Sequence, residues 1–409
     1  MLSDPSTSAQ IHRKTIVVQI IAGFSIESPL GGIERCVVEL STHLDQTKFH
    51  PVVFGLWNFE TEYGEKWKKY LNQKGVETIE GAAWDAAHPY RSFIRSYRTF
   101  EKELKKRDID ILHSHNQFGD IMSLIFKWRG NTARLVRTTH NENEWQRRRL
   151  RRWFLWGLLY PLGFHQEIGI NAKMIEMLDN RPVAKLMKKK SSLIPNALNL
   201  KRFAGYTNHG EAVTKLRASL NIPPGCTVVG TMGRLTLQKG FTNLIHTAKQ
   251  VLQPNPMVYF VIVGSGELEI ELKALAQELG VADRVIFAGS CSNVEDYYKL
   301  FDLFVSSSLW EGLPTVIMES MASGTPIVAT DITGTRDLII DGVNGWLVPP
   351  GEVNLMAEKI LFALANHDIC LEYVNRAFDQ VNQYSIERVA QKQESLYLSL
   401  LLDQTLHED

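Results

Sequence analysis

The stretch LFVSSSLWEGLPTVIMESMASGTPIVAT, residues 303–330, contains the pattern that decides the fold. Its apolar ends, 303–308 and 326–330, predict two buried strands. Between them, Pro314 favours the first position of a helix and Gly324 favours its end. Two buried strands joined by one helix form a βαβ unit, and this arrangement predicts a parallel sheet.

The same alternation of strands and helices recurs along the chain. In the second half, further strands are expected at 227–235, 257–267 and 284–289, with helices at 241–252, 268–279 and 294–300. In the first half, strands are expected at 16–21, 51–56 and 108–115. We therefore predict an α/β protein with two Rossmann-like domains, residues 15–200 and 201–384, whose parallel sheets face each other across an interdomain cleft. Such sheets bind ligands outside the carboxyl ends of their strands, which favours a cleft enzyme.

The remaining segments connect or extend these domains. Residues 192–203 and 206–211 have the composition of a linker. Residues 1–14 lack the apolar stretch of a secretory signal, and we expect them to form a short disordered tail. Residues 385–409 are expected to form an amphipathic helix that docks on one of the domains.

Length and composition favour a soluble two-domain protein. A chain of 409 residues with 44% hydrophobic content is long enough for two cores. It has no run of about 18 apolar residues, so we expect a cytoplasmic protein, with peripheral contact to the inner face of a membrane as an open alternative. The four cysteines lie far apart and predict neither a zinc cluster nor a disulfide framework.

The charge is unevenly divided between the two halves. Residues 1–200 carry 30 Lys and Arg against 21 Asp and Glu, a net charge of +9, and residues 201–409 carry −9. The basic half is expected to face an anionic partner. Because no helix-turn-helix, zinc-finger or RNA-binding aromatic signature is present, we expect a membrane surface or an anionic acceptor rather than a nucleic acid.

Two glutamates flank the start of the helix in the opening stretch. From Pro314 to Glu319 the helix axis advances about 7.5 Å, comparable to the span from a diphosphate to a ribose. The free N–H groups of residues 312–316 would meet phosphate oxygens at the positive end of the helix dipole. Glu319 would then accept hydrogen bonds from the ribose, and Glu311 from a group beyond the phosphates. An ordinary helix start with two exposed glutamates is the alternative.

A second loop of the same domain carries two cations. In GTMGRLTLQKG, residues 230–240, Arg234 and Lys239 lie five positions apart. A diphosphate leaving group gains negative charge as its bond to carbon breaks, and a guanidinium and an ammonium directed at it would stabilise that charge without a divalent metal. A solvated surface pair is the alternative.

The first half offers a glycine pair before a helix. In SPLGGIER, residues 28–35, Gly31 and Gly32 would allow the backbone to approach a phosphate or sugar closely. The pattern is not GxGxxG, which weakens an assignment to a nicotinamide cofactor.

The strand at 108–115 brings two histidines to one side of the sheet. His113 and His115 resemble metal ligands, but no third ligand occurs at a useful spacing, so no metal site is assigned. His115 lies nearer the carboxyl end and is the better candidate for a role in the cleft. His140 likewise follows an expected strand, 134–139. The letters DxD at Asp108 and Asp110 precede the strand, away from the cleft, and are discounted.

Taken together, these motifs resemble the retaining glycosyltransferases of family 4, which have the GT-B architecture. The resemblance covers nearly the whole chain. It rests on GGIER (31–35), DILHSHN (110–116), IPNALNLKRF (194–203), GRLTLQKG (233–240), VGSGE (263–267), the two glutamates eight positions apart, and YSIERVAQKQESLY (384–397).

The resemblance implies a donor site for a nucleotide diphosphate sugar, with no metal and no other cofactor. Its implied contacts are Arg234 and Lys239 to the diphosphate, Glu319 to the ribose, Glu311 and His115 to the transferred sugar, and backbone of Gly312, Leu313, Pro314 and Thr315 to the sugar and phosphates. It also implies that Gly31 and Gly32 close over the phosphates and that the last helix crosses back to the N-terminal domain. The first domain would then bind the acceptor.

One motif departs from the family pattern. The usual Pro-Asn-Gly reads Pro195-Asn196-Ala197. If this position requires a positive φ, alanine costs about 1 kcal/mol there. The local geometry of the linker was therefore an open question.

These inferences predict transfer of a sugar to a hydroxyl acceptor with retention of configuration. No carboxylate nucleophile for a double displacement is identifiable, which favours a front-face path in which the leaving phosphate oxygen takes the acceptor proton. Two alternatives are a nucleotide-sugar-binding protein without catalysis and a nucleotide-sugar epimerase. The base, the sugar, the acceptor and the oligomeric state are not readable from the sequence.

A basic, aromatic stretch follows in NEWQRRRLRRWFLWGLLYPLG, residues 143–163. Its basic residues and the tryptophan beside them are Arg147, Arg148, Arg149, Arg151, Arg152 and Trp153. Arginines beside interfacial aromatics suit a helix on an anionic leaflet, which favours a lipid-linked acceptor such as a glycolipid or a growing polysaccharide. A packed helix, or an anionic acceptor pocket, is the alternative.

Overall fold

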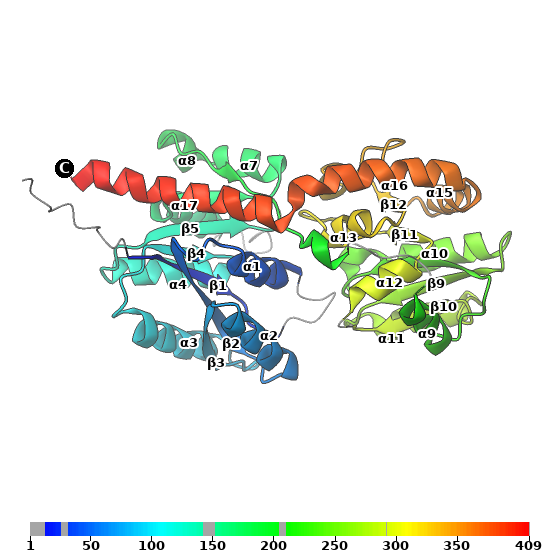
Figure 1. The fold of residues 1–409 in the computed structure, drawn as a ribbon, viewed down its shortest axis with the longest axis horizontal. Coiled ribbons are helices and arrows are strands. Elements are labelled where there is room, and N and C mark those ends of the chain that lie inside the picture. The colour runs from blue at the N-terminus through cyan, green and yellow to red at the C-terminus, as the bar shows by residue number, and fades with distance from the viewer. Residues whose placement is uncertain (1–12, 26–31, 142–151, 204–209, 292, 409) are drawn as a thin grey trace, which may run out of the picture.

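The computed structural model describes residues 13–25, 32–141, 152–203, 210–291 and 293–408. Its helices and strands form two lobes that lie side by side (Figure 1). Each lobe is built on one sheet, and every strand pairing in both sheets is parallel. The predicted α/β fold with two Rossmann-like domains is confirmed.

The first sheet has the order β3-β2-β1-β4-β5-β6-β7. Its strands are β1 (Thr15–Ile21), β2 (Phe49–Asn58), β3 (Glu77–Ala83), β4 (Ile111–Ser114), β5 (Arg134–Thr139), β6 (Gln166–Gly169) and β7 (Ser192–Leu193). The helices of this lobe are α1 (Gly32–Thr42), α2 (Glu62–Gln73), α3 (Pro89–Leu104), α4 (Gln117–Trp128), the π-helix η1 (Arg152–Leu159), α6 (Tyr160–Gly163), α7 (Ala172–Asp179) and α8 (Pro182–Leu186).

The second sheet has the order β10-β9-β8-β11-β12-β13. Its strands are β8 (Thr227–Met232), β9 (Val258–Val263), β10 (Val285–Gly289), β11 (Leu303–Ser306), β12 (Ile327–Thr330) and β13 (Trp346–Val348). Its helices are α9 (Glu211–Ser219), α10 (Phe241–Leu252), α11 (Glu269–Glu278), α12 (Val294–Leu300), α13 (Thr315–Ser323), α14 (Thr333–Arg336), α15 (Val353–Ala365) and α16 (His367–Val381). Short 3-10 turns are η2 (Leu200–Arg202), η3 (Leu237–Lys239) and η4 (Asn382–Tyr384).

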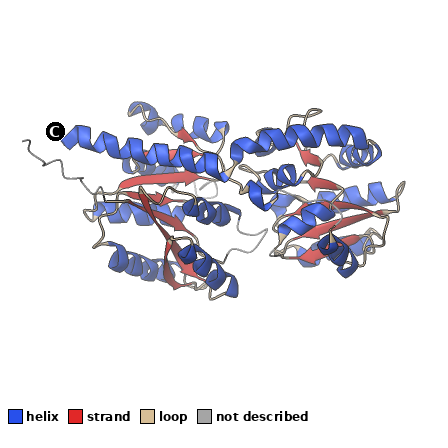
Figure 2. Cartoon of the chain, viewed as in Figure 1, coloured by secondary structure: helices blue, strands red, loops and turns tan. Residues whose placement is uncertain are grey.

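The strands are apolar on both faces because helices cover both faces of each sheet (Figure 2). On β8, the neighbours Val228 and Val229 point to opposite faces, and they pack into two different apolar clusters. On β1, Val17 and Val18 divide in the same way between two clusters of the first domain. Each domain therefore has apolar clusters on both faces of its sheet, and Ile170, Met174 and Leu198 of the first domain join one cluster of the second.

The C-terminal helix α17 (Ile386–Glu408) lies over the first lobe, whereas α15 and α16 lie over the second (Figure 1). Its residues Ile386, Val389 and Tyr397 are buried against Val17 and Ile111 of the first domain. The chain crosses between the lobes just before this helix. The last helix is therefore part of the first domain's core.

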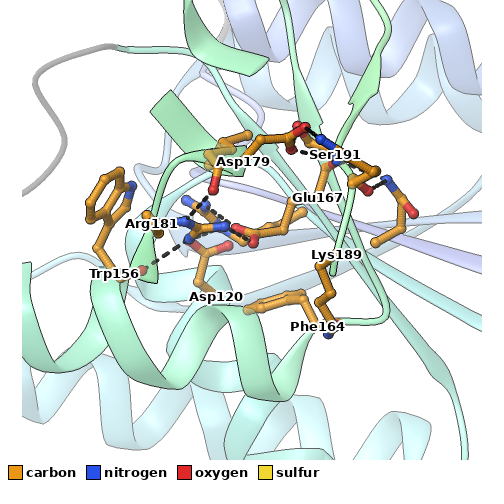
Figure 3. A network of polar contacts seen from close by, with 12 residues as sticks. Asp120, Trp156, Phe164, Glu167, Asp179, Arg181, Lys189 and Ser191 are labelled. Carbon is orange, nitrogen blue, oxygen red and sulfur yellow. Dashed lines mark hydrogen bonds and ion pairs between the residues drawn. The ribbon is translucent and has the colours of Figure 1, made fainter. Parts of the chain in front are cut away.

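A buried ion network supports η1, which lies within the basic, aromatic stretch (Figure 3). The fully buried Arg137 on β5 donates to Asp120 and to Glu167, each over 3.0 Å. Arg181 also donates to Glu167, and to the Trp156 carbonyl over 2.9 Å. Although burial opposes ionisation, the two guanidinium groups hold the pKa of Glu167 below its usual range. Through Arg181, this network ties η1 to β5 and β6.

The structure refines several expected boundaries. Pro314 caps α13, which begins at Thr315 rather than at the proline, and Gly324 ends the helix with a φ of 70°. The start of the expected linker, 192–193, forms β7 instead and completes the first sheet. Residues 1–12 of the expected tail and 204–209 of the linker lie outside the described residues.

Two further sequence inferences concern the cysteines and membrane spans. All four cysteines are free; Cys36, Cys226 and Cys370 are buried, and Cys291 is half-buried. Within the described residues, none of the helices combines the length and the apolar character needed to cross a bilayer.

Candidate active site

A cavity of about 300 Å³ lies between the two domains. The first domain lines it with Gly32, Ile33, His140, Asn141 and Asn196. The second lines it with Gly233, Arg234, Thr236, Gln238, Lys239, Glu311, Gly312, Leu313, Pro314, Thr315 and Val316. These residues of the second domain come from the loop after β8, the loop after β11 and the first turn of α13. The two loops meet because β8 and β11 are neighbours where the strand order reverses.

Two helices begin at this cavity, α1 from the first domain and α13 from the second. Gly32 faces Thr315, because a Cβ atom on Gly32 would lie 3.1 Å from the threonine hydroxyl oxygen. No side chain caps the start of α13 after Pro314, so its first N–H groups lack a side-chain acceptor. Two helix N-termini at one cavity make it a site for an anion such as phosphate. Gly31 lies outside the described residues.

The two predicted cations lie on the wall contributed by the second domain. Arg234 is exposed and follows β8 directly after Gly233. Lys239 ends the turn η3, and Gly240 after it adopts a φ of 62°. A Cβ atom at Gly240 would lie 2.2 Å from the carbonyl oxygen of Ser307, so this turn requires glycine. The close approach of the two loops holds Lys239 beside the loop after β11.

Glu311 and Lys239 form an ion pair rather than lying apart. The Lys239 Nζ atom lies 2.5 Å from Glu311 Oε1, and the two side chains are 17% and 9% exposed. Ser308 Oγ donates to the same carboxylate oxygen over 2.8 Å, and Gln238 Nε2 donates to Oε2 over 3.2 Å. The carboxylate is thus fixed by three donors at the cavity wall.

Glu319 lies on α13 and is 6% exposed. The Tyr298 hydroxyl donates to its Oε2 over 3.0 Å. Burial raises the pKa of Glu319, and the charges of Arg202 and Arg35 oppose this rise. Because Arg35 belongs to α1 of the first domain, Glu319 lies on the side of α13 that faces this domain. It is not one of the residues found to line the cavity in the described part of the chain, so its contact with ribose stays a prediction.

His113 is part of the core rather than of the cavity. Its Nδ1 lies 2.7 Å from the Tyr397 hydroxyl, and its Nε2 lies 2.8 Å from Thr138 Oγ1. Burial lowers the pKa of His113 to about 3, so the ring is neutral.

His115 does not line the described cavity, and His140 lies between the two. His115 Nε2 contacts Gln19 Oε1 at 2.8 Å, and its Nδ1 contacts His140 Nε2 at 3.2 Å. His140, at the end of β5, is the histidine that lines the cavity. The predicted contact of His115 with a sugar would require a route past His140. The strand register places both residues at adjacent strand ends. The sequence signal for His140 was its position directly after a predicted strand, which it shares with His115.

The metal-like motifs have structural roles. Asp110 accepts from Arg13 over 2.8 Å and from the Ile16 N–H over 2.7 Å, at the amino end of β4 and away from the cavity. Across the residues that the structure describes, no group of three or more His, Cys, Asp or Glu side chains is arranged to hold a metal ion. The absence of a metal requirement stays a prediction.

The two domains touch through the loop that carries Glu311. Asn171 Nδ2 donates to the Gly312 carbonyl over 2.8 Å, and Asn196 Nδ2 donates to the Leu313 carbonyl over 3.1 Å. A Cβ atom at Gly312 would lie 2.3 Å from the His140 carbonyl oxygen. Sequence reasoning named Asn196 as part of a linker motif and gave neither asparagine a contact with the Glu311 loop. For Asn171 the available signal was only that of a helix cap, a role it also fills.

The backbone conformation at Ala197 shows whether this position of the motif requires a positive φ. The described non-glycine residues with positive φ are Glu60, Lys188 and Asn221, so Ala197 carries no such strain. Its N–H donates to Cys36 Sγ over 3.1 Å. Alanine is therefore compatible with the conformation of this linker.

The basic, aromatic stretch is described in part. Arg147, Arg148, Arg149 and Arg151 lie outside the described residues, as does the side chain of Arg152. Trp153 on η1 is 70% exposed, and Leu186 on α8 is 84% exposed. The helix α8 packs against η1 and α6, and Lys188 and Lys190 follow it on the surface. Two segments far apart in sequence thus form adjacent parts of one surface.

The fold and the cavity together define a class: two Rossmann-like domains of the GT-B type, with an anion site between the carboxyl ends of their strands. Comparison with protein families gives the same result. The model described as "Glycosyltransferase Family 4" matches residues 30–202, and the model described as "Glycosyl transferases group 1" matches residues 212–380. The chain belongs to the family 4 glycosyltransferases.

Several known proteins are similar to this chain. A lipopolysaccharide core biosynthesis glycosyltransferase, LpsE of Rhizobium meliloti, is 35% identical over 48% of this chain and 56% of its own length, less than two thirds of that relative. The UDP-Gal:alpha-D-GlcNAc-diphosphoundecaprenol alpha-1,3-galactosyltransferase of Escherichia coli is 25% identical over 76% of this chain and 80% of its own. The crystal structure of Anabaena HepE with UDP and glucose has a TM-score of 0.76 at 19% identity, covering 94% of this chain and all of that one, and shows a shared fold.

Proposed function

We propose that this protein transfers a sugar from a nucleoside diphosphate sugar to a hydroxyl acceptor with retention of configuration and without a metal ion. The observation that carries the proposal is the convergence of two helix N-termini and two cationic side chains on one interdomain cavity. A diphosphate there would meet Arg234, Lys239 and the free N–H groups at the start of α13. These groups supply the positive charge that a divalent ion would otherwise bring.

The Lys239–Glu311 pair gives the site a way to respond to the donor. Without a donor, the ammonium is balanced by the carboxylate. A diphosphate competes for that ammonium, and each of its oxygens gains charge as the sugar departs. Glu311 would then be free to accept hydrogen bonds from hydroxyl groups of the transferred sugar, the role expected of it.

Retention is the outcome that the family resemblance implies, and the lining of the described cavity favours a front-face path to it over a double displacement. Glu311 is the carboxylate that lines the described cavity, and its oxygens are held by three donors. A front-face path needs no protein nucleophile, because the departing phosphate oxygen accepts the proton of the incoming hydroxyl. The contacts of Asn171 and Asn196 with the Glu311 loop hold the domains together over the site, which limits competing hydrolysis.

We propose further that the acceptor is lipid-linked and that the protein binds an anionic membrane surface. Support comes from the exposed Trp153 and Leu186 on adjacent elements, with Lys188 and Lys190 beside them. The Escherichia coli relative is named for an acceptor attached to diphosphoundecaprenol. The donor base, the donor sugar and the linkage are to be determined by experiment.

A panel of nucleotide sugars tests the donor site. We expect one or a few donors to raise the melting temperature by mass action, and Arg234→Gln to abolish this rise. Arg376→Gln, on the exposed surface of α16, is the matched control and should bind like the wild type. Product mass then separates the activities: transfer adds a sugar to the acceptor, an epimerase leaves the mass of the nucleotide sugar unchanged, and a binding protein gives no product. Donor binding that is unaffected by Arg234→Gln would contradict the proposed site.

Vesicle sedimentation tests the membrane surface. We expect the protein to sediment with vesicles containing anionic phospholipid and to stay in solution with neutral vesicles. Replacing the five arginines between 147 and 152 with glutamine should remove the effect, and Trp153→Ala should weaken it. Replacing Lys102, Lys105 and Lys106, a basic group on and after α3, is the control and should change nothing. Sedimentation that survives the arginine substitutions would count against this surface.

A further inference from the structure

An arginine in the interdomain linker pairs with carboxylates from both domains. Arg202 lies in η2 and donates from Nη1 to Glu39 Oε1 on α1 over 3.1 Å. Its Nε donates to Glu295 Oε1 on α12 over 2.6 Å. The Arg202, Glu39 and Glu295 side chains are 20%, 8% and 10% exposed, so water screens these pairs less than it screens ordinary surface ion pairs. Arg202 therefore connects a helix of the first domain to a helix of the second.

The ion pairs are not duplicated by apolar packing between these two helices. The buried apolar residues of α1 belong to two clusters of the first domain, whereas those of α12 belong to a cluster built mainly from the second. The paired side chains also line a cavity of about 570 Å³. Arg202 itself is fixed to the second domain, because the next residue, Phe203, is buried in the same cluster as Tyr298 of α12. The contact with Glu39 is thus the point at which the linker holds α1.

Both helices that Arg202 connects lead to the anion site. The helix α1 begins at Gly32, which faces Thr315 at the start of α13. Glu39 lies about two turns further along α1. On the other side, the Tyr298 hydroxyl of α12 lies 2.9 Å from the Val316 carbonyl oxygen in the first turn of α13. Fixing α1 relative to α12 therefore fixes the two helix N-termini across the cavity.

We propose that Arg202 is a positioning residue: by pairing with Glu39 and Glu295 at once, it holds the N-termini of α1 and α13 at the spacing that binds a diphosphate. These three residues form an interdomain clamp. The inference rests on the proposed function only for the identity of the anion. A guanidinium suits this role because its planar fork directs donors to two carboxylates in fixed directions, which a single ammonium does not. When the clamp is broken, α1 is free to move away, and the anion keeps only the donors of the second domain.

Two variants remove the clamp with opposite changes in charge. Arg202→Met removes both ion pairs and keeps the apolar stem, but it leaves two carboxylates short of a partner. Arg202→Met/Glu39→Gln/Glu295→Gln, the neutral variant, leaves no such carboxylate and replaces the single variant should that one not fold. The single variant loses one positive charge, whereas the neutral variant gains one overall because two negative charges are also removed. Lys201→Met is the matched control, since Lys201 lies on the same turn, is 79% exposed and pairs with Glu387 of α17 instead.

Spin-label distances measure the clamp without any donor. Labels at Lys102→Cys on α3 and Lys215→Cys on α9, both exposed positions, report the distance between the domains. A Cys291→Ser background leaves only buried native cysteines. We expect a single narrow distance with the intact clamp and with Lys201→Met, and a longer, broader distribution in both clamp variants.

Calorimetry with inorganic pyrophosphate measures the anion site on proteins that keep their native cysteines. Losing one helix N-terminus should weaken anion binding about three- to tenfold, and we expect this loss in both clamp variants. The neutral variant separates position from charge, because its additional positive charge by itself would strengthen binding. Arg202→Lys should recover part of the affinity, since an ammonium reaches one carboxylate at a time. Lys201→Met, which loses the same charge as Arg202→Met, should bind like the wild type.

The outcomes distinguish the clamp from the proposed function. Unchanged distances in both clamp variants would overturn the inference, as would equal losses in Lys201→Met. Tighter pyrophosphate binding by the neutral variant would show that Arg202 acts through its charge alone, and this too would overturn it. In transfer assays we expect both clamp variants to lower kcat/KM at least about tenfold, because small misplacements of a bound substrate are costly. If the wild type transfers no sugar while the distances and the pyrophosphate affinity respond as expected, the proposed function fails and the clamp stands.

Discussion

Replacement of Lys239 by methionine separates the structural role of the Lys239–Glu311 pair from its catalytic role. The change removes an ammonium 2.5 Å from Glu311 Oε1 and keeps most of the apolar stem. Removing one partner of a fully buried ion pair costs about 3–5 kcal/mol. Here the side chains are 17% and 9% exposed, and Glu311 keeps hydrogen bonds from Ser308 and Gln238. We therefore expect a loss of about 1–2 kcal/mol in the free energy of unfolding.

The double variant Lys239→Met/Glu311→Gln provides the matched comparison. Its neutral amide leaves no unbalanced carboxylate at the cavity wall, so most of the lost stability should return. The melting temperature of a domain of this size changes by about 2–4 °C per kcal/mol of stability. Lys239→Met should therefore melt about 2–8 °C below the wild type, and the double variant should melt close to the wild type. Thermal melting of the protein without a donor measures this part.

Transfer rates should not follow stability. The ammonium is expected to stabilise the departing diphosphate, and the loss of one such group lowers kcat by about 10²–10³. Both Lys239→Met and the double variant should therefore be nearly inactive with a saturating donor, although only the single variant is destabilised. A double variant that transfers sugar at the wild-type rate would refute the assigned role of Lys239. A single variant as stable as the wild type would refute the ion pair.

Three further predictions test other parts of the structure. Gly312→Ala places a methyl group 2.3 Å from the His140 carbonyl oxygen, so it should separate the domains and lower the transfer rate at least tenfold, whereas Gly210→Ala, with open space around its Cβ, should transfer normally. Burial lowers the pKa of His113 to about 3, against about 6.5 in an unfolded chain, so below about pH 6.5 the unfolded state binds a proton that the folded state does not. The free energy of unfolding therefore falls as the pH falls below about 6.5, by about 2 kcal/mol at pH 5. His113→Gln should reduce the pH dependence of urea unfolding by that amount. Arg137→Met leaves two buried carboxylates short of a partner and should destabilise the first domain by about 3–5 kcal/mol, measured by urea unfolding, and a loss below 1 kcal/mol would show that the network of Figure 3 is not needed for stability.

The sequence by itself determined the local structure. Apolar runs place β1, β2, β4 and the strands β8 to β12 within a few residues of their observed bounds, and Gly324 ends α13 as expected. No strand was expected at β3, β6 or β13. The same runs also place Arg234, Lys239 and Glu311 in loops at strand ends, since strand and helix patterns are properties of neighbouring residues. The start of the linker was predicted less accurately, because β7 has only two residues and so has almost no run of apolar residues to mark it as a strand.

Only the tertiary structure decided how the site is assembled. Lys239 meets Glu311 across 72 positions, and Gln19 meets Tyr397 across 378. His140, rather than His115, lines the cavity, and the contacts of Asn171 and Asn196 with the Glu311 loop exist only where the two domains dock. Residue periodicity records which face of an element is buried, but it does not record which distant element covers that face. Hydrogen bonds between such elements follow from the docking of sheets and helices, and so their partners appear only in three dimensions.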